Sequence, residues 1–334
     1  MITTFLATLN PMLTLFTCIV IGFVLSKLKI LPESAGSVMA KLEIWVFCPA
    51  LSFYTMAYYF TTDNIGEHAI NVVIAFLVIC IIVLPFAYLF AKIFVRKNVY
   101  ERNVYRYAMA FSNMGYLGDP VVQSILGDNG LAYYKMYTLP MTLLIYTWGI
   151  NTLVPNDKKH KKNMFVGLVN APTISMLIGM VVGITGIGGF VLGAEDNATF
   201  FGSTLSVLKN CMGPVAMLIA GFTVAKFPIK PMLTNKKVYL ATGVRMIILP
   251  VITVAFVYLL TLLAKVAFGL VVHNMVIHLA YFCSGCALGL NTVVFPEAYG
   301  GEASTGASMA MISHTLCVVI IPIIYALLCV FFPI

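Results

Sequence analysis

The chain has 334 residues, of which 61% are hydrophobic and only 10% are charged, and its formal net charge is +8. A soluble protein carries about 25% charged residues because its surface must be hydrated. The composition therefore excludes a water-soluble fold, a disordered chain and a coiled coil, and predicts an integral membrane protein whose partner is the lipid bilayer. Nucleic acid is not expected as a partner, because basic residues gathered in cytoplasmic loops account for the positive charge.

Apolar stretches long enough to cross a bilayer recur ten times along the chain. A helical span needs about 20 apolar residues, and charges or turn residues bound each stretch. The stretches cover residues 7–27, 37–59, 68–94, 105–127, 131–154, 170–190, 202–225, 238–262, 277–299 and 306–332. The pattern predicts an all-α polytopic membrane protein with ten transmembrane helices. Polar, Gly and Pro residues interrupt the fourth and ninth spans, which predicts broken helices there.

The basic residues predict the orientation of these spans, because loops rich in Lys and Arg stay in the cytoplasm. Sixteen of the 20 basic residues flank every second connection: Lys27, Lys29, Lys41, Lys92, Arg96, Lys97, Arg102, Arg106, Lys158, Lys159, Lys161, Lys162, Lys226, Lys230, Lys236 and Lys237. The second and sixth connections carry the acids Asp63, Glu67, Glu195 and Asp196 instead. Both termini are therefore expected outside the cytoplasm.

Prolines recur at matching places in the two halves of the chain. Pro49 matches Pro214 and Pro85 matches Pro250, in both cases 165 residues apart. Chance is the alternative, since apolar helices share composition, but two equal spacings favour duplication. Five spans per copy would place the second copy upside down in the membrane, an architecture of secondary transporters. The predicted segments are a first inverted repeat over 1–155, a cytoplasmic basic loop over 156–169 and a second repeat over 170–334.

The fourth span carries polar residues at midplane depth. From the cytoplasmic end near Arg106, a helix reaches Asn113 after roughly 10 Å and Asp119 after roughly 20 Å. Pro120 lacks an N–H group and Gly118 relaxes the backbone, so the helix is expected to break here. Broken backbone in lipid must line a cavity or be buried in protein. The freed N–H groups of a half-helix would suit an anion.

The ninth span is the expected partner of the fourth. Gly289, Asn291 and Thr292 are weak helix breakers at the same depth. Crossing of the two spans would bring Asn113 and Asn291 together, and their amides can bind a carboxylate or complete the shell of a cation. The alternative role for each asparagine is a hydrogen bond between helices.

Asp119 is the most informative single residue, because a carboxylate near the midplane marks a functional site by default. It is a candidate for binding H⁺ or Na⁺, or for pairing with a cation. Arg245 and Lys135 are candidate partners, and Arg245 could also attract an anion. Lys135 is expected to extend to the membrane interface instead.

Three further polar residues have an ordinary explanation beside the functional one. Glu43 and Lys209 lie near span ends and are expected at the membrane interface. His314 lies in the tenth span, where it either lines the substrate cavity or is a core histidine with satisfied hydrogen bonds.

The eight cysteines all lie in apolar stretches, where a free thiol behaves as a small hydrophobe. No disulfide framework is expected. Cys283 and Cys286 form a C-x-x-C pattern, but redox or metal use would need polar partners that an apolar stretch seldom provides. We expect no cofactor and no metal site, apart from Na⁺ at Asp119.

Four segments carry a family resemblance: GFVLSKLKILP after the first span, KLEIWVFCPALSF in the second, AFSNMGYLGDPVVQSILGDNG in the fourth, and EAYGGEASTGASMAMISHTLCVVIIPI across the last two. They resemble the auxin efflux carrier family of membrane transporters, which includes bacterial malate and malonate permeases and plant auxin exporters. The most specific part is the pattern N-x-x-x-x-G-x-P, here Asn113, Gly118 and Pro120. The resemblance covers essentially the whole chain.

The resemblance implies a fold like that of bile-acid symporters and sodium/proton antiporters. Spans 1, 2, 6 and 7 would form a scaffold, and spans 3–5 and 8–10 a transport unit in which helices 4 and 9 cross. It also implies elevator-type movement, a homodimer through the scaffold and, from the bacterial permeases, the bacterial inner membrane. Two departures stand out: Asp119 replaces a residue that is commonly aliphatic, and Leu290, Asn291 and Thr292 stand where the family commonly has a proline.

The function predicted from these features is secondary transport of a small organic anion, a mono- or dicarboxylate such as malate, coupled to H⁺ or Na⁺ through Asp119. The candidate binding residues are Asn113, Gly118, Pro120, Asn291, Thr292, Gly289, Arg245 and His314. One alternative is an exporter of auxin-like or other amphipathic carboxylates driven by the membrane potential. An intramembrane aspartyl protease is disfavoured because no second Asp lies at midplane depth, and a channel is disfavoured because polar residues gather on two helices only.

Overall fold

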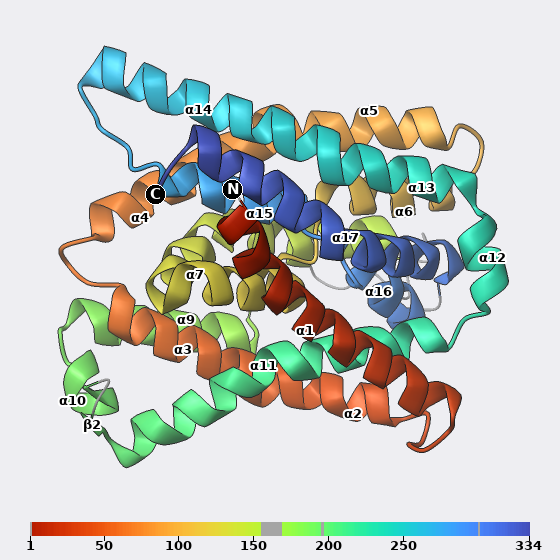
Figure 1. The fold of residues 1–334 in the computed structure, drawn as a ribbon, viewed down its shortest axis with the longest axis horizontal. Helices are drawn as coiled ribbons and strands as arrows, with labels where there is room; N and C mark the ends of the chain where they lie inside the picture. Colours follow the sequence, from red (N-terminus) through yellow and green to blue (C-terminus); the bar gives the residue numbers. More distant parts are fainter. Residues whose placement is uncertain (1, 155–168, 195–196, 300) are drawn as a thin grey trace.

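The computed structural model describes residues 2–154, 169–194, 197–299 and 301–334, and its regular elements are helices except for one short hairpin (Figure 1). The basic cluster Lys158, Lys159, Lys161 and Lys162 and the acidic pair Glu195 and Asp196 lie outside the described residues. The hairpin pairs β1 (Gly193–Ala194) antiparallel to β2 (Asn197–Ala198).

The first half of the chain contains eight α-helices and four π-helical turns. In chain order these are α1 (Ile2–Lys27), α2 (Ala35–Leu42), η1 (Glu43–Phe47), α3 (Cys48–Tyr59), α4 (Ile65–Val78), η2 (Ile79–Val83), α5 (Leu84–Phe94), α6 (Val99–Ala110), η3 (Met114–Gly118), α7 (Asp119–Leu144), η4 (Ile145–Gly149) and α8 (Ile150–Leu153).

The second half continues with a similar succession of long and short helices. Its described elements are α9 (Ala171–Ile184), α10 (Gly188–Leu192), α11 (Phe200–Ala225), α12 (Ile229–Thr234), α13 (Lys236–Gly243), η7 (Val244–Ile248), α14 (Leu249–Phe268), α15 (Met275–Gly285), α16 (Asn291–Tyr299) and α17 (Ser304–Phe331).

Six continuous helices in the described residues are long and apolar enough to cross a membrane: Ile2–Lys27, Ala35–Tyr59, Ile65–Phe94, Phe200–Ala225, Lys236–Phe268 and Ser304–Phe331. Two shorter apolar helices, Ala171–Ile184 and Met275–Gly285, accompany them. The other predicted spans fall on helices that are divided or short, such as α15 and α16. These helices agree with a polytopic, mostly helical membrane protein.

Prolines explain four of the five described π-turns, all except η4. Pro49, Pro85, Pro120 and Pro250 are each the second residue after a π-turn. A proline has no N–H, and its ring clashes with the carbonyl one turn earlier, so a wider turn relieves both problems. Pro214, by contrast, lies inside the uninterrupted α11. The match between the two halves therefore extends to local structure for Pro85 and Pro250, but not for Pro49 and Pro214.

Glycines allow two pairs of helices to pack with their backbones in close contact. α1 crosses α11, and α3 lies along α9 (Figure 1). A methyl group at Gly22 of α1 would meet the carbonyl of Leu218 in α11, and one at Gly183 of α9 would meet the carbonyl of Phe60. Small residues at such positions are typical of helix contacts in membranes, where close approach replaces the hydrophobic effect.

We expect Gly22→Val to destabilise the protein by about 1–3 kcal/mol, because the added side chain overpacks the contact of α1 with α11. The measurement is the thermal unfolding of purified protein in detergent. Gly243→Val is the matched control, since nothing lies within 4 Å of a methyl group added at Gly243. Equal melting temperatures for the two variants would contradict the close packing.

Candidate functional site

Two helix breaks lie against each other and satisfy each other's backbone groups. α6 ends at Ala110 and α15 at Gly285, and the chain is extended beyond both ends. The N–H of Asn113 donates to the carbonyl of Ala287 at 2.7 Å, and the N–H of Gly289 donates to the carbonyl of Phe111 at 3.3 Å. Each break therefore supplies partners that lipid could not offer.

Side chains reinforce this meeting point from both sides. The hydroxyl of Ser112 donates to the carbonyl of Cys283 at 2.6 Å. The hydroxyl of Ser313 in α17 accepts from the N–H of Leu288 at 3.0 Å. Buried hydroxyls thus hold the second break between the first break and α17.

His314 holds the side chain of Asn113 by a hydrogen bond. Its Nδ1 lies 2.7 Å from the carbonyl of Ala310, and its Nε2 lies 2.9 Å from Nδ2 of Asn113. A carbonyl only accepts, so Nδ1 carries the proton and Nε2 accepts from the Asn113 amide. His314 is 3% exposed and does not line the cavity described next. It therefore orients Asn113.

A cavity of about 160 Å³ lies beside the two breaks. Ligand pockets of drug size measure about 300–1,000 Å³, so this one suits a small metabolite. Its polar lining consists of Ser52, Ser112, Asn113, Asp119, Lys135, Thr138, Thr142, Asn170, Thr173 and Asn291, together with Tyr116 and Tyr146. Asn113, Asn291, Asp119 and Gly289, which the sequence placed around the middle of the membrane, thus lie around one space.

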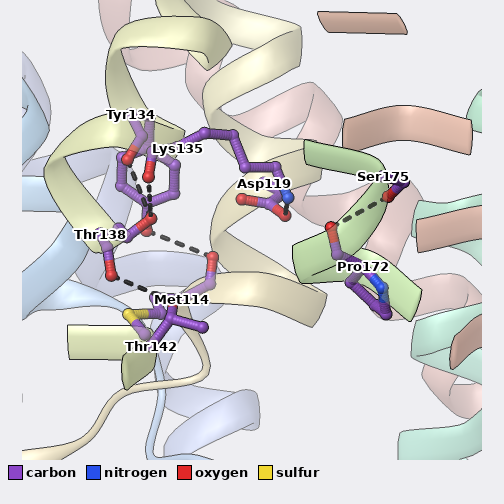
Figure 2. A network of polar contacts seen from close by, with 8 residues as sticks. All are labelled: Met114, Asp119, Tyr134, Lys135, Thr138, Thr142, Pro172 and Ser175. Carbon is purple, nitrogen blue, oxygen red and sulfur yellow. Dashed lines mark hydrogen bonds and ion pairs between the residues drawn. The ribbon is translucent and has the colours of Figure 1, made fainter. Parts of the chain in front are cut away.

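An ion pair between Asp119 and Lys135 forms part of the cavity wall (Figure 2). The exposed fractions of the two side chains are 3% and 11%. Gly127 has φ 71° and ψ −177°, and at this kink α7 joins two helical segments. The left-handed φ favours glycine. The kink brings residue 135 beside residue 119, so the expectation that Lys135 extends to the membrane interface is wrong.

Hydrogen bonds hold the π-turn η3 against the segment that carries Lys135. The hydroxyl of Tyr134 donates to the carbonyl of Met114 at 3.3 Å, and that of Thr138 donates to the carbonyl of Tyr134 at 2.9 Å (Figure 2). A methyl group at Gly118 would meet the Tyr134 hydroxyl. Gly118 therefore permits this close approach and does not line the cavity.

Pro120 also serves a helix contact. A methyl group added at Gly213 of α11 would lie 3.0 Å from the Pro120 ring, so the ring packs on the α11 backbone. The sequence predicted a helix break at Pro120. The helix instead ends at Ala110 and resumes as η3, because the π-turn accommodates the proline.

The start of α16 completes the lining on the second break. Asn291 faces the cavity, and its Nδ2 donates to the hydroxyl of Tyr107 at 3.1 Å. Thr292 is buried, and its hydroxyl donates to the carbonyl of Gly289 at 2.8 Å. Thr292 therefore closes the turn that presents Gly289 and Asn291.

Two expectations about interfacial charges are wrong, because Glu43 and Lys209 face other helices. Glu43 is 0% exposed, its carboxylate has no hydrogen-bond partner among the described residues, and it lies within electrostatic reach of Lys135 and Asp119. Lys209 is 6% exposed and pairs with Asp128 at 2.5 Å, just beyond the kink in α7. Hydropathy locates a charge along a helix but does not say which face carries it.

Arg245, a predicted binding residue, lies outside the cavity. It is 1% exposed, it does not line the cavity, and it donates to the carbonyl of Ser284 in the last turn of α15. The structure thus separates Arg245 from Asp119, whose partner is Lys135.

Sequence reasoning missed the polar residues that follow Lys135 on its own helix. Thr138 and Thr142 line the cavity together with Lys135. Their spacing of three and seven residues from Lys135 places all three on one helical face, and this spacing was the available signal.

The residue types that bind metal ions are dispersed over the described residues. No cluster of three or more His, Cys, Asp or Glu side chains occurs among them. Cys283 and Cys286 are free and buried. A cation entering the site would meet the carboxylate of Asp119, with that of Glu43 nearby.

Comparison with known proteins identifies the family of the chain. A family model described as Membrane transport protein matches residues 7–167 and 159–325. A protein of Methanothermobacter thermautotrophicus described as an uncharacterized transporter is 23% identical over 263 residues, which cover 77% of this chain and 80% of that protein. The family match spans nearly the whole chain. The chain therefore belongs to the Membrane transport protein family, the auxin efflux carrier family that its motifs resemble, and is an integral membrane protein with a general role in transport.

Proposed function

We propose that the protein is a secondary transporter of small organic anions and that the cavity between the two helix breaks binds the carboxylate. The observation that carries the proposal is the composition of this cavity, where an ammonium and two amides surround a space of about 160 Å³. Lys135 supplies the positive charge, and Asn113 and Asn291 supply hydrogen-bond donors. Mono- and dicarboxylates of malate size fit this description.

The ion pair in the wall accounts for coupling. While Asp119 is ionised, Lys135 is neutralised, and a substrate carboxylate would bring an uncompensated negative charge into a buried site. Protonation of Asp119 releases the ammonium of Lys135 to the substrate. One proton would therefore enter with one carboxylate, and Na⁺ at Asp119 could serve the same purpose. The other titratable groups in electrostatic reach of Asp119 are Glu43, Cys48, Tyr134 and Cys286.

The architecture proposed for this transporter is a 5+5 inverted repeat, 1–155 and 170–334, whose broken helices cross at the site. The scaffold would consist of α1 to α3, α9 and α11, and the transport unit would contain α4 to α8 and α13 to α17. The packing of α1 on α11 and of α3 on α9 supports this division, because all four belong to one unit. Elevator movement, a homodimer through the scaffold, both termini outside the cytoplasm and a bacterial inner membrane complete the proposal.

The test is binding of a panel of carboxylates, amines and neutral compounds to the purified protein, at two pH values and with or without Na⁺. We expect carboxylates to bind, with an affinity that rises by up to about tenfold per pH unit as the pH falls. Preferential binding of a cationic or neutral compound would contradict the anion assignment. Carboxylate binding that depends on neither pH nor Na⁺ would instead favour an exporter driven by the membrane potential.

A further inference from the structure

The lining of the carboxylate cavity holds one cationic side chain among the described residues, that of Lys135. Its one carboxylate there is Asp119, which forms an ion pair with Lys135. The amides of Asn113 and Asn291 can donate hydrogen bonds but carry no charge. The described lining of the empty site is therefore electrically balanced and offers no second cation.

The groups around this ion pair add no positive charge. Glu43 is buried within electrostatic reach of Lys135 and Asp119, and it is acidic. The other titratable groups that the described residues place around the pair are thiols and phenols: Cys48, Tyr116, Tyr134, Tyr146 and Cys286. Thiols and phenols are ordinarily uncharged at neutral pH. The surroundings of the pair are therefore neutral or negative.

Two other buried cations are engaged outside the cavity. Lys209 pairs with Asp128 at 2.5 Å, and Arg245 donates to the carbonyl of Ser284. Neither of them lines the cavity. A substrate with two ionised carboxylates would thus find, among the described residues, a cation for only one of them.

The rest of the cavity wall suits an uncharged part of a substrate. Ile44 of η1, Leu139 of α7, Met176 of α9 and Met212 of α11 contribute apolar side chains to it. An apolar chain can contact these side chains favourably, whereas an ionised group would lose its hydration against them. The wall therefore favours one charged end and one uncharged end.

The net charge of the ion pair and its ligands stays at zero when one proton and one carboxylate enter together. In the empty site, Lys135 balances the ionised Asp119. In the loaded site, Asp119 is protonated and Lys135 balances the substrate carboxylate. A second ionised carboxylate would leave one buried negative charge without a partner, which is strongly unfavourable. An ionised Glu43 would repel it further.

We infer that the site takes its substrate as a monoanion: a short monocarboxylate, or a dicarboxylate that has already bound one proton. This inference rests on the proposed function, because Lys135 and Asp119 are the groups that exchange charge there. The size of the cavity leaves both mono- and dicarboxylates open. The single ammonium of Lys135 then selects between them by charge.

The test is binding to the purified protein of compounds that share a shape but differ in charge. Succinate, succinamate and succinamide carry two, one and no negative charges at neutral pH, and malonate, malonamate and malonamide form a shorter series. We expect each monoamide to bind about tenfold more tightly, or better, than its dicarboxylate, because the second charge has no partner in the site. The diamide should bind most weakly, since it has no carboxylate for Lys135.

The possible outcomes separate this inference from the proposed function. A dicarboxylate that binds as tightly as its monoamide would overturn the monoanion but keep the carboxylate site. A diamide that binds as tightly as its monoamide would contradict the carboxylate site itself.

Addition of a second cation to the wall should change the preference. Thr142 lines the cavity on the same face of α7 as Lys135, about 10 Å further along the helix. We expect Thr142→Lys to bind succinate at least as tightly as succinamate. Thr142→Gln is the matched control, of similar length but without a charge, and should keep the wild-type preference for succinamate. The same preference in both variants would show that the charge of the wall does not select the substrate, and would overturn the inference.

Discussion

Replacement of Lys135 by methionine is expected to weaken carboxylate binding and transport by about 100-fold or more. Methionine keeps the length of the side chain but removes the ammonium that faces the cavity. Loss of one partner of a buried ion pair costs about 3–5 kcal/mol, and 1.4 kcal/mol corresponds to a factor of ten in affinity. The measurements are substrate binding to purified protein and uptake into proteoliposomes.

Lys209→Met provides the control for this experiment. Lys209 is also buried in an ion pair, with Asp128 at 2.5 Å, but it does not line the cavity. We expect this variant to lose stability while its substrate affinity stays within about twofold of the wild-type value, because distant sites act independently. Wild-type affinity in Lys135→Met, or equal losses in the two variants, would remove Lys135 from the binding site.

The sequence predicted much of the site because its polar residues stand near the middle of otherwise apolar spans. Asn113, Asp119 and Asn291 are polar residues in otherwise apolar spans, and an apolar background makes such residues conspicuous. The rise of a helix then places them on either side of the membrane midplane, within about 10 Å of one another in depth. The structure brings all three to the same cavity.

The residues that the sequence misplaced depend on details that hydropathy does not contain. Lys135 reaches Asp119 only because the chain bends at Gly127, which has a left-handed φ. The sequence contains many glycines, and nothing in it distinguishes Gly127 from the others. Glu43 lies in a π-turn, where the widened helix changes which residues face a neighbour. The same effect moved the expected break away from Pro120. Such local departures from a regular helix alter the direction of a side chain without altering its depth.

Arg245 illustrates a different limit of sequence reasoning. A buried arginine in a predicted anion transporter is readily assigned to the substrate. The structure instead buries it outside the cavity, where it donates to the carbonyl of Ser284 in α15. The charge was visible in the sequence, but Ser284 lies 39 residues further along the chain, and only the packing of η7 against α15 brings the two residues together.

Substitution of Asp119 by asparagine is expected to abolish the dependence of carboxylate binding on pH. In the wild-type protein, protonation of Asp119 frees Lys135, so affinity rises as the pH falls. Asparagine is neutral at every pH and leaves Lys135 available to the substrate. The variant should therefore bind carboxylate at high pH as tightly as at low pH, while a pH gradient no longer drives uptake into proteoliposomes. If Na⁺ is the coupling ion, the same variant should lose the dependence on Na⁺ instead.

Glu43→Gln is the matched control, because Glu43 is the other buried carboxyl group within electrostatic reach of Lys135. It has no hydrogen bond to Lys135 or to any other described residue, so its neutralisation should leave the ion pair and the pH dependence in place. The pair of variants then decides which carboxyl carries the proton. Wild-type pH and Na⁺ dependence in Asp119→Asn, combined with their loss in Glu43→Gln, would move the coupling site from Asp119 to Glu43. If both variants keep the dependence on pH and on Na⁺, neither carboxyl group couples ion binding to substrate binding. Lys135 would then not exchange the carboxylate of Asp119 for that of the substrate.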